Sequence, residues 1–272
     1  MSQQLFNALW IGNSLSKLEL LTIYSFINNG HTFRLWIYDK EVAKQLPPQV
    51  LIGDANEIIP VNKVFNYKQT NTFGHGKGSY AGFSDIFRYK MLYLHGGWWV
   101  DMDITCVKPI DFTSEYFFRA HHELILVGNV IKCPKGSEVM LKCFEEATQS
   151  VNENNTDWHK PIEILCRNVQ QFGLEKYVVS NLSNHDKWDE TVQFIKTRKV
   201  IPMQYYFLHW QNEEWRHRPL DKNNVRIQST LGELMQLNGL LAKQYTQWQL
   251  ALNRFQQTWF YQNLKLLGLV DN

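Results

Sequence analysis

Apolar side chains between residues 80 and 95 recur three and four positions apart, which is the spacing of one face of an α-helix. Two glycines follow this helix, and glycine commonly supplies the left-handed residue that ends one. The apolar run of residues 98–100 then predicts a buried strand. Side chains alternate along a strand, so Trp99, Asp101 and Asp103 are expected on one face of it. This stretch therefore predicts a helix, a turn and a strand that ends in two carboxylates.

A strand, a helix and a second strand are predicted near the N-terminus. Residues 5–11 and 32–38 are apolar runs of strand length, and the segment between them opens with a capping box at residues 16–19. Strand, helix and strand at this spacing form a βαβ unit, whose strands are parallel. Ligands of such sheets bind beyond the carboxyl ends of the strands, where Trp10 and Ile11 lie.

The middle of the chain continues the alternation of strands and helices. Strands are expected at residues 105–109, 116–120, 124–131 and 200–210, and helices at residues 136–151 and 161–173. Strands that alternate with helices predict an α/β fold in which helices cover the faces of a sheet.

The polar segment 62–79 predicts a flexible loop that orders over a bound ligand. Its glycine-rich end is not a P-loop, because Asn71 stands where the first glycine belongs and Gly78 replaces the required Ser or Thr. We therefore expect Lys77 in solvent rather than on a phosphate.

Two adjacent histidines, His121 and His122, follow the strand that is expected at residues 116–120. Neighbouring residues of a strand point to opposite faces, so these two side chains are not expected to hold one metal ion. A role at the surface or toward an acceptor is expected instead.

From Leu231 onward the composition shifts to glutamine, leucine and aromatic residues. Six apolar residues there follow a 4-3-4-3-4 spacing, which predicts a narrow helix–helix seam: Leu241, Tyr245, Trp248, Leu252, Phe255 and Trp259. We expect a catalytic domain at residues 1–230 and a helical extension at 231–272 that packs on it. The charged residues between positions 239 and 270 are all basic, so docking on a partner or on an anionic membrane stays an alternative.

Length and composition narrow the class of protein. A chain of 272 residues can bury a full core in one domain, with or without an extension. A formal charge of +2 argues against a protein that mainly binds polyanions. Four cysteines without a CxxC pair predict free thiols in a reducing compartment, and no run is long enough to span a bilayer. The N-terminus has no signal-peptide pattern, so a soluble, cytoplasmic, bacterial protein is expected.

The two carboxylates at the end of an apolar strand carry the chemistry. Two carboxylates are costly to hold side by side in an apolar setting unless a cation lies between them. Their hard oxygens suit Mg²⁺ or Mn²⁺, which also takes phosphate oxygens from a substrate. Asp85 and Arg88 lie three residues apart in the preceding helix and so share one of its faces.

The run SDIFRYKMLYLHGGWWVDMD resembles the DXD sugar-binding region of family-32-type glycosyltransferases. These relatives include fungal mannosyltransferases, bacterial polysaccharide-synthesis enzymes and, more distantly, the glucosylating toxins. The resemblance implies the GT-A type of fold, with a Rossmann-like, mainly parallel central sheet flanked by helices and a helical C-terminal extension. It also implies that Asp101 and Asp103 hold Mn²⁺ or Mg²⁺ on the diphosphate of a nucleotide sugar.

The same resemblance implies further donor contacts. Asp85 and Arg88 fall where relatives contact the donor sugar and its nucleotide, and Trp99 is a candidate aromatic contact. Trp10, with Ile11 beside it, matches a strand-end Trp-x-Gly that borders the nucleotide base, although a tryptophan of the core is the equal alternative.

A late aromatic run ends in a histidine that is able to bind a metal. Transferases of the GT-A fold commonly bring a late histidine back to the metal, so His209 is the candidate third protein ligand. Trp210 or Trp215 is then a candidate cover for the donor site. A histidine that is merely hydrogen-bonded in the fold is the alternative.

The favoured function is a metal-dependent, retaining transfer of a hexose from a UDP-hexose or GDP-mannose to a glycan or other hydroxyl acceptor. Capsule, exopolysaccharide or lipid-linked polysaccharide synthesis is the expected setting, with no nucleic-acid partner and contact with the inner face of the membrane as an option. A haloacid-dehalogenase-type phosphatase is the alternative enzyme, with Asp101 as nucleophile and Asp186 and Asp189 as its later acidic pair. A non-catalytic sugar- or nucleotide-binding protein is the third.

Overall fold

A seven-stranded sheet forms the centre of the computed structural model, which describes residues 3–72 and 74–269. The strands, in the order in which they pair, are β3 (Leu51–Asp54), β2 (Thr32–Ile37), β1 (Leu5–Trp10), β4 (Gly97–Val100), β7 (Leu126–Cys133), β6 (Phe117–Ala120) and β8 (Val178–Val179). The first four are parallel, β7 runs antiparallel to both of its neighbours, and β8 is parallel to β6. The predicted α/β fold with a mainly parallel sheet is confirmed.

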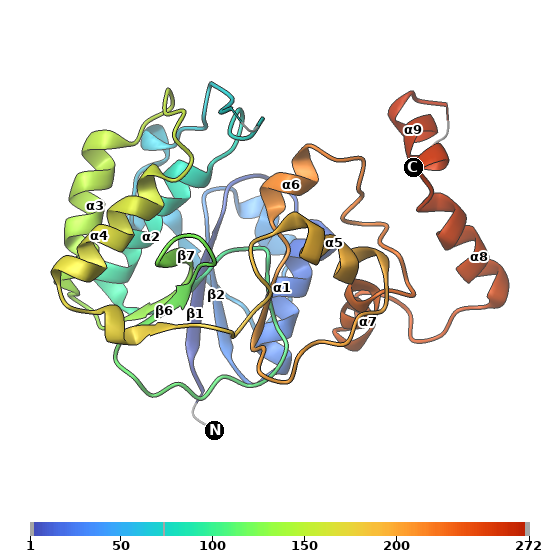
Figure 1. Cartoon of the computed structure of the whole chain (residues 1–272), viewed down its shortest axis with the longest axis horizontal. Coiled ribbons are helices and arrows are strands. Elements are labelled where there is room, and N and C mark those ends of the chain that lie inside the picture. The colour runs from blue at the N-terminus through green and yellow to red at the C-terminus, as the bar shows by residue number, and fades with distance from the viewer. Residues whose placement is uncertain (1–2, 73, 270–272) are drawn as a thin grey trace.

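Helices cover both faces of this sheet (Figure 1). One face carries α2 (Ala81–His95), α3 (Glu138–Ser150) and α4 (Lys160–Gln171), and the other carries α1 (Lys17–Asn28), α5 (Trp188–Lys196) and α7 (Thr230–Leu237). On this second side β5 (Ile104–Cys106) pairs with β9 (Phe207–His209) in a separate two-stranded sheet. The predicted helices at residues 136–151 and 161–173 correspond to α3 and α4.

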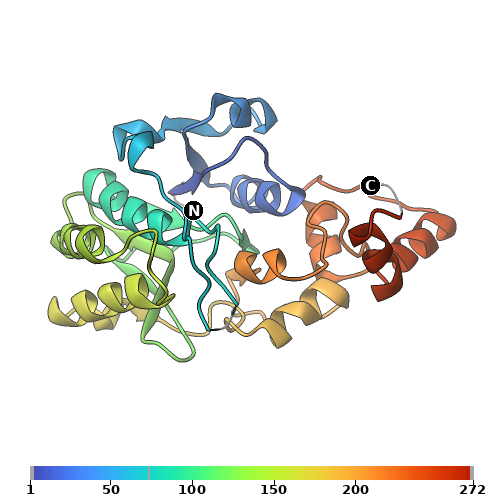
Figure 2. The same ribbon diagram turned by 90° about the horizontal axis from the view of Figure 1, so that it is seen from above.

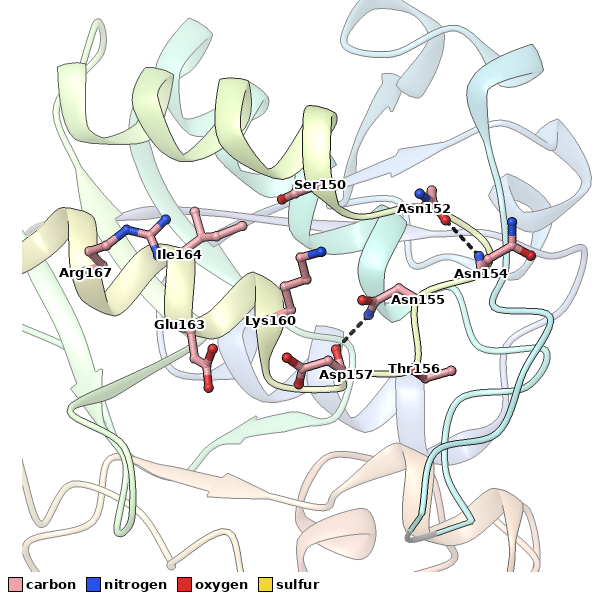
Figure 3. Close-up of a pocket in the computed structure, with 10 residues that line it drawn as sticks. All are labelled: Ser150, Asn152, Asn154, Asn155, Thr156, Asp157, Lys160, Glu163, Ile164 and Arg167. Carbon is pink, nitrogen blue, oxygen red and sulfur yellow. Dashed lines mark hydrogen bonds between the residues drawn. The ribbon is translucent and has the colours of Figure 1, made fainter.

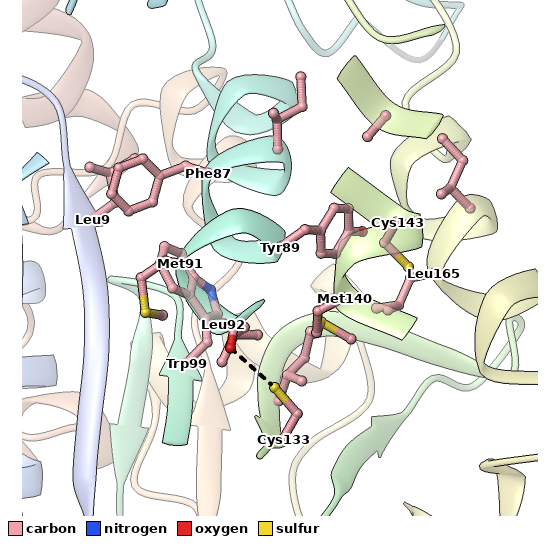
Figure 4. Packing of buried hydrophobic residues seen from close by; sticks show 14 of the residues in the cluster. Leu9, Phe87, Tyr89, Met91, Leu92, Trp99, Cys133, Met140, Cys143 and Leu165 are labelled. Atoms are coloured by element: carbon pink, nitrogen blue, oxygen red, sulfur yellow. Dashed lines mark hydrogen bonds between the residues drawn. The ribbon is translucent and has the colours of Figure 1, made fainter. Parts of the chain in front are cut away.

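Alternating side chains of β4 enter the two hydrophobic layers. Trp98 packs on the side of α1 with Phe6 and Phe117, whereas Trp99 packs on the side of α2 with Phe87. Figure 4 shows Trp99 among Met91, Leu92 and the other side chains of its layer. Deleting either tryptophan side chain is expected to cost about 3–5 kcal/mol. Because β4 is buried on both faces, it is held in place, and the position of Asp101 directly after it is fixed.

The order of the strands creates a switch point between β1 and β4. The chain runs outward from β1 through β2 to β3, and α2 then brings it back to β4 on the other side of β1. In open parallel sheets, ligands bind in the crevice beyond the carboxyl ends of the strands at such a point. Trp10 ends β1 there, and Asp101 follows β4.

The secondary structure differs from the sequence prediction at two places. The edge strand β3 was not predicted, because its residues are mostly exposed and lack a clear alternation. The strand expected at 200–210 shortens to β9. Short and edge strands depend on pairing partners that lie far away in the sequence, which a local pattern does not show.

The C-terminal stripe does not form one helix that packs on the domain. The chain there folds into α8 (Gln247–Gln256) and α9 (Trp259–Leu266), which lie at one end of the molecule (Figures 1 and 2). Trp248 is 74% exposed, and the buried residue of α8 is Asn253. The side chain of Trp259 lies outside the described residues. The expected apolar docking within the chain is therefore wrong for Trp248, and α8 is held by hydrogen bonds of Asn253 to residues 225 and 227.

The main core extends past the predicted domain boundary at residue 230. Leu231, Leu234 and Met235 of α7 are buried in one cluster with Leu18 and Leu21 of α1. All four cysteines are free and buried, as the absence of a disulfide pattern predicted. None of the helices within residues 3–72 and 74–269 combines the length and apolarity that crossing a bilayer requires.

Candidate functional site

Asp101 and Asp103 lie in a turn between β4 and β5 at the switch point. The Ile104 amide donates to the carbonyl of Asp101, so the chain turns here and the strand alternation ends at Val100. The prediction that Trp99, Asp101 and Asp103 continue one strand face is therefore wrong. Because of the turn, the two carboxylates contact different parts of the protein.

Asp101 belongs to a cluster around Arg88 of α2. The guanidinium Nη2 lies 3.0 Å from Asp101 Oδ1 and 3.2 Å from Asp85 Oδ1, and its carbon lies 5.3 Å from the centre of the Trp99 ring. The Trp99 indole also donates to Asp101 Oδ1 at 2.7 Å. Arg88 is 5% exposed, so it is a buried cation between two carboxylates. The helical spacing of Asp85 and Arg88 and the adjacent strand bring these groups together.

Gly128 of β7 makes room for this arginine. A Cβ atom at position 128 would lie 2.2 Å from Arg88 Nη1, which is closer than any van der Waals contact. The glycine is therefore a steric requirement of the arginine cluster, and sequence analysis gave no sign of it. The residues are 40 positions apart and meet only across the sheet.

Burial dominates the electrostatics of Asp85 and Asp101. Desolvation raises the pKa of Asp85 to about 6, although Arg88 opposes it. Desolvation and the neighbouring Asp103 carboxylate also raise the pKa of Asp101, against the effect of Arg88. Arg88 therefore offsets only part of the cost of burying these two carboxylates. A cation beside Asp101 and Asp103 would stabilise both in their ionised forms.

Asp103 contacts the segment after β9. His209 Nε2 lies 3.3 Å from Asp103 Oδ2, and the backbone amide of Asn212 donates to the same oxygen at 2.7 Å. The Trp210 amide donates to the Asp103 carbonyl at 3.0 Å. The structure thus brings the predicted His209 to the Asp pair across more than a hundred positions of sequence.

His209 is oriented by a second carboxylate that sequence analysis assigned only to the phosphatase alternative. His209 Nδ1 lies 2.5 Å from Asp186 Oδ1, and Arg119 binds both oxygens of Asp186 at 2.9 Å. Burial alone would lower the pKa of His209, but Asp103 and Asp186 raise it to about 10. The ring is therefore held as an imidazolium between the Asp103 and Asp186 carboxylates.

The oxygens around Asp103 fit a hard divalent cation. Asn212 begins α6 (Asn212–Arg216), and its Oδ1 is buried without a hydrogen-bond partner. An orphaned amide oxygen is costly unless it gains a partner, and amide and carboxylate oxygens are ligands of Mg²⁺ and Mn²⁺. Asp101, Asp103 and the Asn212 amide oxygen are therefore candidate ligands for the predicted metal, and His209 Nε2 lies 3.3 Å from Asp103.

The two adjacent histidines differ from expectation. Strand β6 ends at Ala120, so His121 and His122 do not alternate across a strand, and their ring centres lie 4.4 Å apart. With Asp186 they form the only group of three acidic, histidine or cysteine side chains within the described residues whose ligand atoms lie within 4.8 Å of one another. The expectation that they point to opposite faces is wrong.

This histidine group is nonetheless a poor metal site. His121 Nδ1 accepts the amides of Glu123 and Leu124 at 3.1 and 3.0 Å, so the proton of the neutral ring lies on Nε2, toward Asp186. Metal binding through Nε2 would displace that proton to an atom that already accepts two hydrogen bonds. The Arg119 guanidinium also occupies both oxygens of Asp186.

The candidate aromatic donor contacts lie mostly in the core. Trp210 is 0% exposed and donates to Thr105 Oγ1 at 2.8 Å, and Trp215 is also buried and donates to the Trp210 carbonyl. Trp99 is 1% exposed. All three rings are buried in the core, so their assignment to a donor surface is corrected. Trp10 is half-buried at the end of β1, with Ile11 beside it.

The loop at residues 62–79 reaches the site from two sides. Its Gly76 amide donates to Glu213 of α6 at 2.9 Å, and Arg216 donates to the Lys77 carbonyl at 2.8 Å. On its other side, the Lys68 amide donates to the Glu153 carbonyl at 2.7 Å. The loop therefore joins the α3–α4 connection to the helix that follows His209.

Comparison with known proteins agrees with this geometry. Residues 22–118 match a family described as a glycosyltransferase sugar-binding region containing a DXD motif. The match includes α2, β4 and the Asp101–Asp103 pair, so the chain carries a glycosyltransferase DXD region and resembles these enzymes. Regions of this family generally bind a divalent metal and a nucleotide sugar. No curated protein matches the chain.

Two solved structures are similar at low identity. A PaToxG glycosyltransferase has a TM-score of 0.47 and 17% identity, with 62% of this chain and 68% of that chain covered. A transferase with two cysteine-to-serine substitutions has a TM-score of 0.41 and 10% identity, with 63% and 85% covered.

Proposed function

We propose that the protein is a metal-dependent, retaining hexosyltransferase that moves a sugar from a nucleotide-diphosphate donor to a hydroxyl group of a glycan acceptor. The observation that carries the proposal is the DXD region, whose Asp101 and Asp103 lie at the switch point of a mainly parallel sheet. The donor diphosphate meets this pair, and its base lies toward Trp10 at the end of β1. UDP-hexoses and GDP-mannose are the donors to be tested first.

Asp101, Asp103 and Asn212 would hold the divalent ion, and His209 would be a further ligand through a deprotonated Nε2. The ion supplies positive charge against the charge that develops on the departing nucleoside diphosphate. Asp186 then accepts from Nδ1 and holds the His209 ring, and Arg119 holds Asp186. A carboxylate behind a ligating histidine fixes its tautomer and orientation.

Asp85 and Arg88 serve the donor in different ways. Arg88 lies between Asp85 and Asp101 and keeps these buried carboxylates ionised and in place. Asp85 then has oxygens that accept hydrogen bonds from the hydroxyl groups of the donor sugar. This division follows from burial, since a cation that already pairs with two carboxylates has less capacity left for phosphate.

The setting of the reaction is part of the proposal. Buried free cysteines suit a reducing compartment, so we place the enzyme in the bacterial cytoplasm, in capsule, exopolysaccharide or lipid-linked polysaccharide synthesis. The basic C-terminal helices would contact the inner face of the membrane, through exposed side chains that include Trp248.

The test is turnover of UDP-glucose, UDP-galactose and GDP-mannose with Mn²⁺. We expect nucleoside diphosphate to be released from one of them, and Asp101→Asn and Asp103→Asn each to lower the rate by roughly two to three decades. Asp189→Asn removes an exposed carboxylate outside the site and is the matched control. Turnover that is unchanged in both site variants would exclude the role of the pair.

The phosphatase alternative makes a separate prediction about the same carboxylate. A phosphatase nucleophile at Asp101 would bind beryllium fluoride as a mimic of aspartyl-phosphate. In a crystal soaked with beryllium fluoride we expect no adduct at Asp101. Free phosphate as the product, or such an adduct, would replace the transferase by the phosphatase.

A further inference from the structure

A polar groove opens between α3 and α4 at the same edge of the sheet as the Asp pair. Its volume is about 750 Å³, and Figure 3 shows its lining side chains on the end of α3, the start of α4 and the connection between them. Helix α3 ends there and α4 begins there, close to the N-terminal part of α2 that carries Asp85. The DXD region does not include this groove, since the match ends at residue 118.

The lining offers hydrogen-bonding groups with few partners inside the protein. The Asn154 amide, the Thr156 hydroxyl, the Lys160 ammonium and the Glu163 carboxylate line the groove, and their side chains are mostly exposed. Amide groups present donors and an acceptor in one plane, whereas carboxylates accept and ammonium groups donate. Such a mixture matches neighbouring hydroxyl groups, each of which donates and accepts.

The charge of the groove favours an uncharged ligand. Two cations, Lys160 and Arg167, are balanced by two carboxylates, Asp157 and Glu163. Arg167 also pairs with Glu146 of α3. A site for phosphate or another strong anion would carry an excess of positive charge, usually with free arginines. With Glu146 counted, the groove has no excess of positive charge, which disfavours an anionic ligand and favours a neutral, polyhydroxylated molecule.

Tyr67 connects this groove to the donor site. Its hydroxyl lies 3.5 Å from Asn155 Nδ2 on the groove side, and a Cβ at Gly82 would lie 2.1 Å from the same hydroxyl. Gly82 precedes Asp85 by three residues of α2, which is about 4.5 Å along the helix axis. Both Asp85 and Asp157 act on the Tyr67 hydroxyl, after burial, to raise its pKa. One tyrosine side chain thus separates the two sites.

We propose that the α3–α4 groove is a carbohydrate subsite that binds the part of a neutral oligosaccharide acceptor remote from the reacting hydroxyl. This inference rests on the proposed transferase activity. The reacting end of the acceptor lies beside Asp85 and Asp101, and the acceptor continues along the surface above the buried Tyr67 into the groove. The subsite selects acceptors of more than one sugar and disfavours anionic ones.

The test uses an array of neutral, sialylated and phosphorylated oligosaccharides, followed by calorimetry with the best-bound one in free form. The variant Asn154→Ala with Glu163→Ala removes two exposed lining groups. Its matched control, Glu145→Ala with Gln149→Ala, removes the same kinds of group from the exposed surface of α3. We expect a neutral oligosaccharide to bind, and the groove variant to weaken its affinity about ten-fold while the control leaves it unchanged.

Donor hydrolysis with Mn²⁺, measured without acceptor, separates the subsite from the activity. The groove variant should keep this hydrolysis within about two-fold, because it lies outside the donor site. Oligosaccharide binding that disappears in the groove variant, in a protein that releases no nucleoside diphosphate, would support the subsite and refute the transferase. Equal affinity in both variants, a preference for anionic glycans, or no oligosaccharide bound would overturn the subsite.

Discussion

At the scale of single residues, the site depends on charges that the fold buries together. Arg88 lies between Asp85 and Asp101 with 5% of its surface exposed, and Gly128 leaves the space that its guanidinium fills. Buried ion pairs contribute little net stability when intact, but the loss of one partner leaves an uncompensated charge. The cluster is therefore sensitive to small changes in shape.

We expect Arg88→Ala to lower the free energy of unfolding by about 3–5 kcal/mol, because two buried carboxylates lose their cation. Gly128→Ala should cost about 1–3 kcal/mol, because its new methyl group displaces the guanidinium. Urea unfolding of both variants and of the double variant measures these changes.

The double variant is the control for the steric explanation. Once Arg88 is alanine, the methyl group at position 128 no longer meets the guanidinium, so the cost of Gly128→Ala should nearly vanish. An unchanged cost in the Arg88→Ala background would mean that residue 128 acts through the strand and not through the arginine.

At the scale of elements, polar contacts join segments that are distant in the sequence. His31 follows α1, and its Nε2 accepts the backbone amide of Ile110 at 3.0 Å. Burial lowers the pKa of His31, so the folded protein keeps this ring neutral. Asn253 attaches α8 in a comparable way, through the backbone at residues 225 and 227.

We expect His31 to lower the stability of the protein in acid. The unfolded state binds the proton more readily than the folded state, so His31 contributes full stability above its ordinary pKa of about 6.5 and loses it as the pH falls below that value. Urea unfolding at pH 7.5 and pH 5.5 should therefore show a smaller decrease for His31→Gln than for the wild type. Equal decreases in both proteins would contradict this role.

The C-terminal helix gives the next prediction. Trp248→Ser and Phe255→Ser should change the free energy of unfolding by less than about 0.5 kcal/mol, because both side chains are largely exposed. Asn253→Ala in the same helix should cost about 1–3 kcal/mol, because it leaves buried backbone groups unpaired. Urea unfolding compares the three variants.

The same variants address what the exposed side chains are for. Binding of Trp248→Ser to anionic vesicles, compared with that of the wild type, tests the membrane contact. If Trp248→Ser instead destabilised the protein as much as Asn253→Ala, the result would support the predicted packing of the C-terminal apolar residues on the domain.

At the scale of the whole molecule, four segments that are distant in the sequence converge at the Asp pair and at α6 beside it. The turn after β4 supplies the Asp pair, α2 supplies Asp85 and Arg88, the segment after β9 supplies His209 and Asn212, and the loop at residues 62–79 spans from α6 to the α3–α4 connection. A ligand bound among these segments should stabilise the entire fold by mass action.

We expect a nucleoside diphosphate to raise the melting temperature only when Mn²⁺ is present. At 100 times its dissociation constant the ligand should add about 2.7 kcal/mol. Thermal unfolding with and without Mn²⁺, after chelation, measures the effect, and the Asp101→Asn and Asp103→Asn variants should lack it. An equal rise in chelator would contradict the metal role of the pair.

The sequence by itself determined several elements and the central motif. The capping box at Ser16, the helical spacing of residues 80–95 and the glycines before β4 act locally, so a local pattern predicts α1, α2 and β4 correctly. The DXD resemblance identified the region that the family match confirms. These features depend on neighbours within a few residues, where propensity and periodicity dominate.

The tertiary structure alone decided which partners those residues meet. Asp186, held by Arg119, orients His209, and the Asn212 amide donates to Asp103. Gly128 leaves room for Arg88. These residues are too far apart in the sequence for a local pattern to predict their contacts. It also decided that Trp99 and Trp210 lie in the core while Trp248 is exposed, because burial depends on what the rest of the chain places beside a side chain. Sequence spacing fixes the face on which a residue lies, and only packing fixes what that face contacts.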